Sequence, residues 1–288
     1  MTIRISSNQI LDAGVQSMDA SLTEAMSQQH KISSGNNYSK ASDNAYAVAR
    51  GVRLSFDTTK MAMFTQNQNF VASSMANSDT QFSSIGNQMN ILQQLMVQSQ
   101  DGSLNASNYT ELQQAAQGYL DTIQTQATAL DGTGKPIFPQ TATVNRVQIE
   151  PNVMVNTAVK YSDAFGGAGA PSKTDVIAKI QDFVNYLGHK AAGQNIDTTA
   201  MQLVAKGLQD ASSQISIVQE GAGAIAKQVD NSKNATNSID TQLKATSSAL
   251  LDTDLAAATA AYTRAQTILS AAQAMFAKIS QTNLFSKL

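Results

Sequence analysis

The sequence predicts a mainly α-helical protein built from long antiparallel rods, with coiled-coil helices at its two ends and a small β-containing insert in the middle. Three observations support this prediction. All four prolines lie in one short central stretch, at Pro136, Pro139, Pro151 and Pro171, and proline interrupts helices. Apolar residues recur at heptad spacing on both sides of that stretch. Inside it, β-favouring runs alternate with turn residues.

The first heptad register begins near the N-terminus. Its positions are Leu11, Val15, Met18, Leu22, Ala25, Gln29 and Ile32. Only Gln29 is strongly polar, so the spacing predicts one amphipathic helix of about six turns. Gly35 and the asparagines after it indicate the end of this helix, because both residue types tolerate the left-handed conformation of a C-terminal cap.

A second, longer register follows. Its positions are Leu54, Asp57, Met61, Phe64, Gln68, Val71, Met75, Ser78, Phe82, Ile85, Met89, Leu92 and Met96. This predicts a helix of roughly 40 residues or more, about 60 Å long at 1.5 Å per residue. A turn is predicted at Asp101–Ser103, followed by a returning helix. The inward positions of that helix are Leu112, Ala116, Tyr119, Ile123, Ala127 and Leu130, and it is predicted to end at Asp131–Gly134.

The centre of the chain has a different pattern. Two runs favour β-strands, Thr143–Ile149 and Val153–Val155, and a glycine-rich tract follows them at 166–170. A short helix is then predicted, with Val176, Ile180, Phe183 and Leu187 facing inward. This stretch therefore predicts a small insert of mixed α and β structure.

The heptad pattern returns at Val204 and continues to Leu250, which predicts a second long rod. A last register follows at Leu255, Ala258, Tyr262, Ala265, Leu269, Ala272, Phe276 and Ile279. In it, large residues alternate with alanine, as they do where two helices interdigitate closely. Before this helix, Asp252 and Asp254 are interpreted as an N-cap and a favourable first-turn charge rather than as a catalytic pair.

The composition excludes several classes of function. Charged residues make up 14% of the 288 residues and the net charge is −2, which gives no electrostatic reason to bind nucleic acid. No stretch approaches the roughly 18 consecutive apolar residues of a membrane span. The chain has no cysteine, and its two histidines, His30 and His189, lie far apart in sequence. We therefore expect no catalytic site, cofactor or metal, no nucleic-acid partner and no membrane insertion.

The terminal helices are predicted to contact other copies of the chain. Their polar faces consist mainly of Ala, Gln, Thr and Ser, and such weakly charged helices gain most of their stability from neighbours. The predicted subunit-interface residues are Leu11, Val15, Met18, Leu22, Leu255, Tyr262, Leu269, Phe276 and Ile279.

Several motifs resemble the bacterial flagellin superfamily. They are Ile3–Ser6, Ile32–Gly35, Lys40–Asn44 and the C-terminal Asn283–Leu288, and the resemblance spans residues 1–138 and 239–288. Further motifs resemble the branch of hook-filament junction proteins, known as hook-associated protein 3. These are Ile91–Gln94, Asp101–Leu104, Asp131–Phe138 and Asp252–Ala256.

The resemblance implies a structural, non-enzymatic protein of the extracellular flagellum. It implies export through the flagellar type III apparatus and assembly as a ring that joins hook-associated protein 1 to flagellin. It also implies a dedicated export chaperone that binds the last helix, at Leu255, Tyr262, Leu269 and Phe276. Two alternatives stay open: a short flagellin that forms the filament itself, and a secreted coiled-coil effector or translocator.

Residue pattern and resemblance together predict three regions. Residues 1–40 and 251–288 form paired terminal helices that assemble with other subunits and are disordered in the free monomer. Residues 41–135 and 199–250 form the long-helix rod domain. Residues 136–198 form a small outer domain of α and β structure.

Overall fold

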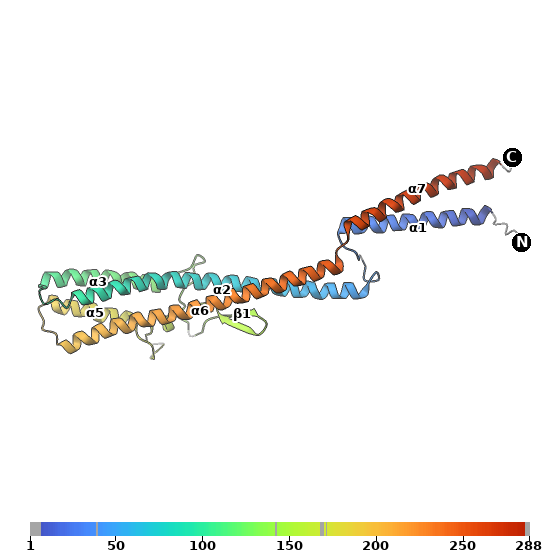
Figure 1. The fold of residues 1–288 in the computed structure, drawn as a ribbon. Helices are drawn as coiled ribbons and strands as arrows, with labels where there is room; N and C mark the ends of the chain where they lie inside the picture. Colours follow the sequence, from blue (N-terminus) through green and yellow to red (C-terminus); the bar gives the residue numbers. More distant parts are fainter. Residues whose placement is uncertain (1–6, 39, 142, 168–169, 171, 286–288) are drawn as a thin grey trace. The chain divides into compact units, whose positions relative to one another are not determined.

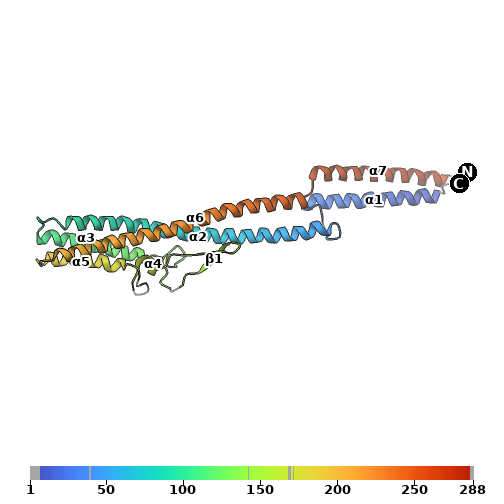
Figure 2. The same ribbon diagram turned by 60° about the horizontal axis from the view of Figure 1, so that its bottom comes forward.

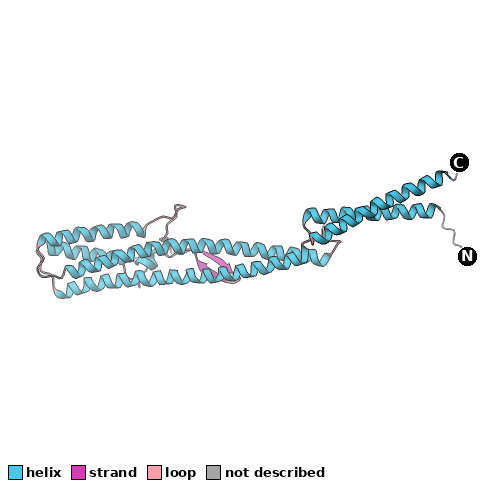
Figure 3. Cartoon of the chain, turned by 45° about the horizontal axis from the view of Figure 1, so that its top comes forward, coloured by secondary structure: helices cyan, strands magenta, loops and turns pink. Residues whose placement is uncertain are grey.

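The structure, a computed structural model, describes residues 7–38, 40–141, 143–167, 170 and 172–285. These residues form seven helices and one two-stranded sheet (Figures 1 and 3). The mainly α-helical class predicted from the sequence is confirmed. Contacts divide the chain into a terminal unit, Met1–Lys60 with Ile239–Leu288, and a central unit, Met61–Ser238.

The longest elements are α2 (Ala45–Gln98) and α6 (Thr198–Leu251). The heptad register predicted from Leu54 to Met96 is confirmed by burial, since every position except the half-buried Asp57 is buried. On α6, the buried positions include Leu208, Ala211 and Ile215, again as the spacing predicts. Both helices gain their stability by burying one apolar face, since neither begins with acidic nor ends with basic residues that would favour the helix dipole.

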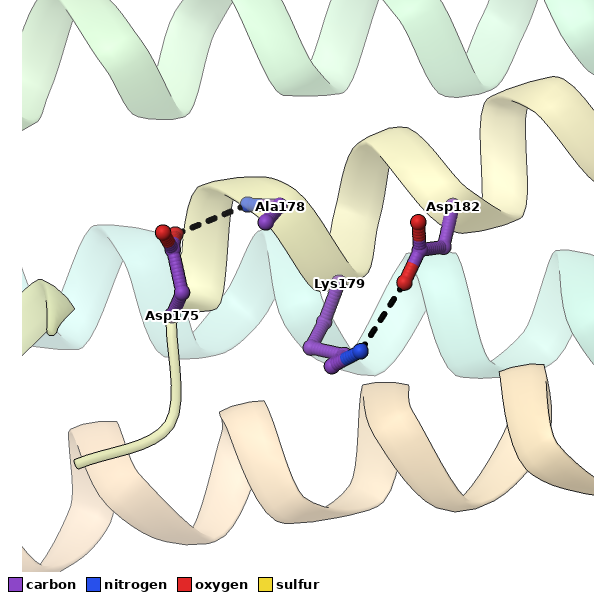
Figure 4. Close-up of polar contacts among 4 residues, drawn as sticks. All are labelled: Asp175, Ala178, Lys179 and Asp182. Carbon is purple, nitrogen blue, oxygen red and sulfur yellow. Dashed lines mark hydrogen bonds and ion pairs between the residues drawn. The ribbon is translucent and has the colours of Figure 1, made fainter. Parts of the chain in front are cut away.

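Two shorter helices complete the central bundle. In α3 (Ala106–Ala127), Asn105 and Asn108 form a reciprocal capping box at the N-terminus, which satisfies two otherwise unpaired N–H groups. The other short helix of the bundle, α5 (Val176–Ala191), packs against α3. The Asp175 carboxylate accepts a hydrogen bond from the backbone N–H of Ala178 at 2.9 Å (Figure 4). One turn on, an exposed ion pair joins Lys179 and Asp182.

The β structure is a hairpin of β1 (Arg146–Glu150) and β2 (Val153–Asn156), paired antiparallel. Asn152 adopts a φ of 65° in the turn, a conformation that asparagine tolerates better than most residues. Figure 2 shows the hairpin beside α2. The predicted first strand began at Thr143, but pairing starts at Arg146 because β2, its partner, ends at Asn156.

Amide side chains hold the hairpin against the helices. The Asn67 side chain donates to the carbonyl of Gln148 at 2.8 Å, and the Gln68 side chain donates to the carbonyl of Ile149 at 2.8 Å. The Gln68 amide nitrogen also donates to the Thr236 hydroxyl on α6 at 2.9 Å. A polar residue at a buried heptad position thus donates a hydrogen bond to a backbone carbonyl of a strand.

One aromatic cluster joins the insert to the rods. The ring of Phe138 lies between Phe82 of α2 and Phe165 of α4 (Tyr161–Phe165). Its centroid is 4.8 Å from that of Phe82 and 5.4 Å from that of Phe165. The rod residues and the predicted outer domain, 136–198, therefore share one hydrophobic core. The insert lies within the central unit, Met61–Ser238, whereas the sequence predicts it as a region of its own. The separate roles of the three predicted regions in assembly stay a prediction.

Limited proteolysis of the dilute monomer is expected to trim residues before about Ser42 and after about Leu250 first. Among the described side chains of α1 (Ser7–Ser34) and α7 (Leu255–Phe285), only the small Ala25, Ala258 and Ala265 are buried. Two helices with so thin a core hold together weakly. Mass spectrometry of the fragments would identify the cut sites, and termini as resistant as the central unit would contradict the expectation.

Candidate assembly surface on the terminal helices

The terminal unit contains α1 and α7, which lie side by side (Figure 1). On α7, the heptad positions predicted from the sequence lie on the face that is less accessible to solvent than the rest of the helix. Ala258 and Ala265 are buried there, while Tyr262, Leu269 and Phe276 are half-buried. Opposite this face, a Cβ atom added to Gly14 would lie 3.9 Å from the Phe276 ring. Small residues therefore face large ones across the pair, as close helix packing requires.

The face of α1 that packs against α7 differs from the predicted one. Its least accessible positions are Gly14, Met18, Ser21, Ala25, Gln28 and Ile32, and Lys31 next to Ile32 is also half-buried. Met18, Ala25 and Ile32 belong to the predicted register, but Val15 and Leu22 are 43% and 47% exposed. The physical reason is size, because Gly14 and Ser21 allow close approach where Val15 and Leu22 would hold the helices apart.

Three further predicted interface residues are Leu255, Leu11 and Ile279. Leu255 is 55% exposed; it is the first residue of α7, and the buried positions begin one turn later, at Ala258. Its place in a subunit interface stays a prediction. Leu11 and Ile279 lie in α1 and α7, but their side chains fall outside the described residues.

The outward faces of this pair are unusually apolar. The large exposed apolar residues are Val15, Leu22 and Met26 on α1, and Leu255, Ile268 and Met275 on α7. Met26, Ile268 and Met275 were not among the predicted interface residues. The seven-residue spacing of Ile268 and Met275 is the signal that would have found them. Exposed apolar side chains gathered on one pair of helices are typical of a surface that other proteins cover.

Hydrogen bonds join the segment that follows α1 to the segment that precedes α7. The N–H of Asn37 donates to the carbonyl of Leu251 at 2.7 Å, and the N–H of Thr253 donates to the carbonyl of Gly35 at 2.9 Å. Asp254 accepts a hydrogen bond from the N–H of Ala257 at 3.0 Å. Its carboxylate therefore caps α7, as the sequence predicts.

The titratable groups of the described residues indicate structural roles. Hydrogen bonding by Ser103 lowers the pKa of Asp101, and the Thr133 side chain and the Lys135 backbone lower the pKa of Asp131. Both carboxylates stabilise turns. The described residues contain no group of three or more His, Cys, Asp or Glu side chains that could hold a metal ion. None of the helices in the described part of the chain combines the length and the apolarity that crossing a membrane requires.

Comparison with known sequences identifies relatives along most of the chain. The family described as the bacterial flagellin N-terminal helical region matches residues 5–143. A flagellin from Listeria monocytogenes is 21% identical over 262 residues, which is 90% of each chain. A flagellin from Listeria innocua matches equally well.

Solved structures with a similar fold come from flagellar proteins. A flagellar hook-associated protein from Vibrio parahaemolyticus aligns with a TM-score of 0.64 at 14% identity, over 72% of this chain and 99% of that one. Flagellar hook-associated protein 3 from Legionella pneumophila aligns with a TM-score of 0.58 at 14% identity, over 67% and 96%. The matched N-terminal region, the relatives and the fold agree: the chain is similar to bacterial flagellins in sequence and to flagellar hook-associated proteins in fold.

Proposed function

We propose that this chain is a structural protein of the bacterial flagellum, located outside the cell at the junction between hook and filament. The single observation that best supports this role is the α1–α7 pair, in which the buried residues among the described side chains are all alanines and large apolar residues are exposed on both helices. Such a pair needs other subunits to cover it.

The proposed partners follow from this position. Copies of the chain pack through the outward faces of α1 and α7 and form a ring, which joins hook-associated protein 1 on one side to flagellin on the other. The subunit travels to this position through the flagellar type III export apparatus. The fold similarity to hook-associated proteins favours this role over that of a filament subunit.

A short flagellin is the second candidate function. The observation that favours it is the sequence similarity to Listeria flagellins over 90% of both chains. The two candidates predict different amounts of polymer. A flagellin elongates indefinitely in concentrated solution, whereas a junction protein stops at short assemblies.

Deletion of the gene in the source organism distinguishes these functions. Loss of a junction protein is expected to leave hooks in place while flagellin appears in the culture medium, because filament subunits have nothing to attach to. Electron microscopy and immunoblotting of the medium would measure both. Expression of the full chain in the deletion strain is the control and should restore attached filaments. Hooks without shed flagellin would favour the short flagellin, and normal attached filaments in the deletion strain would contradict both.

We also propose that α7 binds a dedicated cytoplasmic chaperone before export. Leu255, Tyr262, Leu269 and Phe276 form its predicted contact, and the last three are the residues that α7 turns toward α1. An amphipathic helix presented at heptad spacing fits an apolar groove on a partner. The chaperone would therefore replace α1 on the same face of α7.

Truncation after Leu251 is expected to eliminate chaperone binding measured by calorimetry. Because the central unit, Met61–Ser238, has its own core, its thermal unfolding should stay unchanged. Truncation of the other terminal helix, by removal of residues before Ser42, is the matched control and should preserve binding. Undiminished binding by the chain that ends at Leu251 would refute the assignment.

A further inference from the structure

One regular stripe of exposed residues runs along the outward face of α1. Its positions are Asp12, Val15, Asp19, Leu22 and Met26, and all of them are exposed. The steps alternate between three and four residues, so at 3.6 residues per turn the five side chains fall within a sector of about 80°. We call these five positions the α1 stripe.

A matching stripe runs along α7. Its positions are Arg264, Ile268, Ala271, Met275 and Lys278, and all of them are exposed. Read backwards from Lys278, they follow the same three-and-four spacing as the α1 stripe. We call them the α7 stripe. Both stripes lie within the terminal unit, and their apolar members include Met26 and Met275, which are 63% and 62% exposed.

The packing of α1 on α7 determines how the two stripes are placed along the pair. The helices run antiparallel, with Gly14 beside Phe276 (Figure 1). From that contact the inward positions of α1 up to Ile32, and those of α7 back to Ala258, follow the same steps of four and three residues. Each position of one stripe is therefore level with a position of the other. Val15 is level with Met275, and Leu22 with Ile268.

The two stripes lie on opposite sides of the α1–α7 pair. At 100° per residue, each stripe is about 120° round its helix from the inward positions, in one sense on α1 and in the other sense on α7. Because the helices are antiparallel, these opposite senses make the stripes point in opposite directions. A second copy in the same orientation, moved sideways, therefore presents its α1 stripe to the α7 stripe of the first.

The charges on the stripes favour this arrangement. The charged residues of the α1 stripe, Asp12 and Asp19, are acidic, and those of the α7 stripe, Arg264 and Lys278, are basic. Contact between two α1 stripes would bring carboxylates together, and contact between two α7 stripes would bring cations together. Contact between an α1 stripe and an α7 stripe brings opposite charges together instead.

We propose that the α1 stripe of one copy of this chain packs on the α7 stripe of the next copy, with Val15 against Met275 and Leu22 against Ile268. The contact is heterologous, since two different surfaces meet, and it generates a ring where the rotation between copies closes. This inference rests on the proposed function, in which copies meet through their terminal helices, and it specifies which surface meets which.

Cross-linking of the full-length chain tests this contact. The chain has no cysteine, so single substitutions react cleanly. A Leu22→Cys variant is mixed with an Ile268→Cys variant, concentrated at low ionic strength and treated with a short bismaleimide. Mass spectrometry is expected to identify a product that joins the two variants. A dominant product between two Leu22→Cys chains, or between two Ile268→Cys chains, overturns the proposal.

The matched control for this cross-link is Ser270→Cys in place of Ile268→Cys. Ser270 is exposed on α7, two residues from Ile268, but helical geometry places it on the opposite side of the pair. It should therefore give about tenfold less product with Leu22→Cys. Equal yields from Ser270→Cys and Ile268→Cys contradict the proposed surface.

Charge reversal provides the second arm. Asp12→Lys with Asp19→Lys on the Leu22→Cys chain is expected to lower the yield about tenfold, because like charges then face each other. Arg264→Glu with Lys278→Glu on the Ile268→Cys chain should restore it. Glu24→Lys is the control and should leave the yield unchanged, since Glu24 is exposed on the side of α1 away from the stripe. A yield that ignores both reversals overturns the proposal.

Sedimentation of the same samples separates this inference from the proposed function. Assemblies that form without the Leu22–Ile268 product overturn the contact between the stripes and leave the flagellar role standing. A chain that stays monomeric at every concentration overturns the contact, and attached filaments in the deletion strain would independently overturn the flagellar role.

Discussion

Replacing Phe276 with aspartate is expected to abolish assembly while the central unit stays folded. Phe276 is half-buried on the face of α7 that packs over Gly14 of α1. A carboxylate there would lose water without gaining a partner, at a cost of several kcal/mol. Among the side chains described for the α1–α7 pair, the buried ones are alanines, and so small a core cannot offset such a loss. Leu269→Asp should act in the same way, because Leu269 lies on the same face.

Sedimentation of the purified variant and counts of attached filaments in cells would measure this effect. Circular dichroism on heating would show whether the central unit still unfolds as in the natural chain. Gln273→Asp is the matched control, because Gln273 is exposed on the same helix and gains the same charge. Normal motility and filament numbers with Phe276→Asp would show that this face does not support assembly.

Replacing Phe82 with alanine is expected to destabilise the central unit by about 3–5 kcal/mol, through lost burial and the cavity left behind. Phe82 is fully buried, and its ring centroid lies 4.8 Å from that of Phe138. Because Phe138 comes from the insert and Phe82 from α2, the substitution should loosen the insert as well as the bundle.

Urea denaturation of the full-length chain would give the free energy of unfolding. Phe56→Ala is the control, since its 69% exposure predicts a change within about 0.5 kcal/mol. A double substitution with Phe138→Ala should cost less than the sum of the single changes, because the two rings share one contact. Equal losses from Phe82→Ala and Phe56→Ala would contradict the assignment of this cluster as the core.

The longest helices of this protein were predictable from the sequence. The register from Leu54 to Met96 is buried at almost every position, because a helix that packs along its whole length must repeat its apolar side with the period of the helix. Local chemistry likewise predicted the turn at Asp101–Ser103 and the cap at Asp254, where the partners lie within a few residues.

The partner faces of α1 were less predictable. Heptad spacing placed Val15 and Leu22 in the seam, while the structure places Gly14 and Ser21 there and leaves the larger residues exposed. The periodicity of the sequence identifies an apolar stripe on a helix, but it does not determine which neighbouring helix packs against that stripe. That choice depends on how closely two helices approach, which the side-chain sizes on both helices determine together.

The sequence by itself thus determined the helices, their length and their apolar faces, because these depend on residues one or two turns apart. The tertiary structure decided the contacts between distant segments. Gln68 is one example: it occupies a buried heptad position, yet its partners are the carbonyl of Ile149 and the hydroxyl of Thr236, 81 and 168 residues away. Such pairs form only where packing brings the segments together, because a buried amide bonds whichever polar group the fold places within reach.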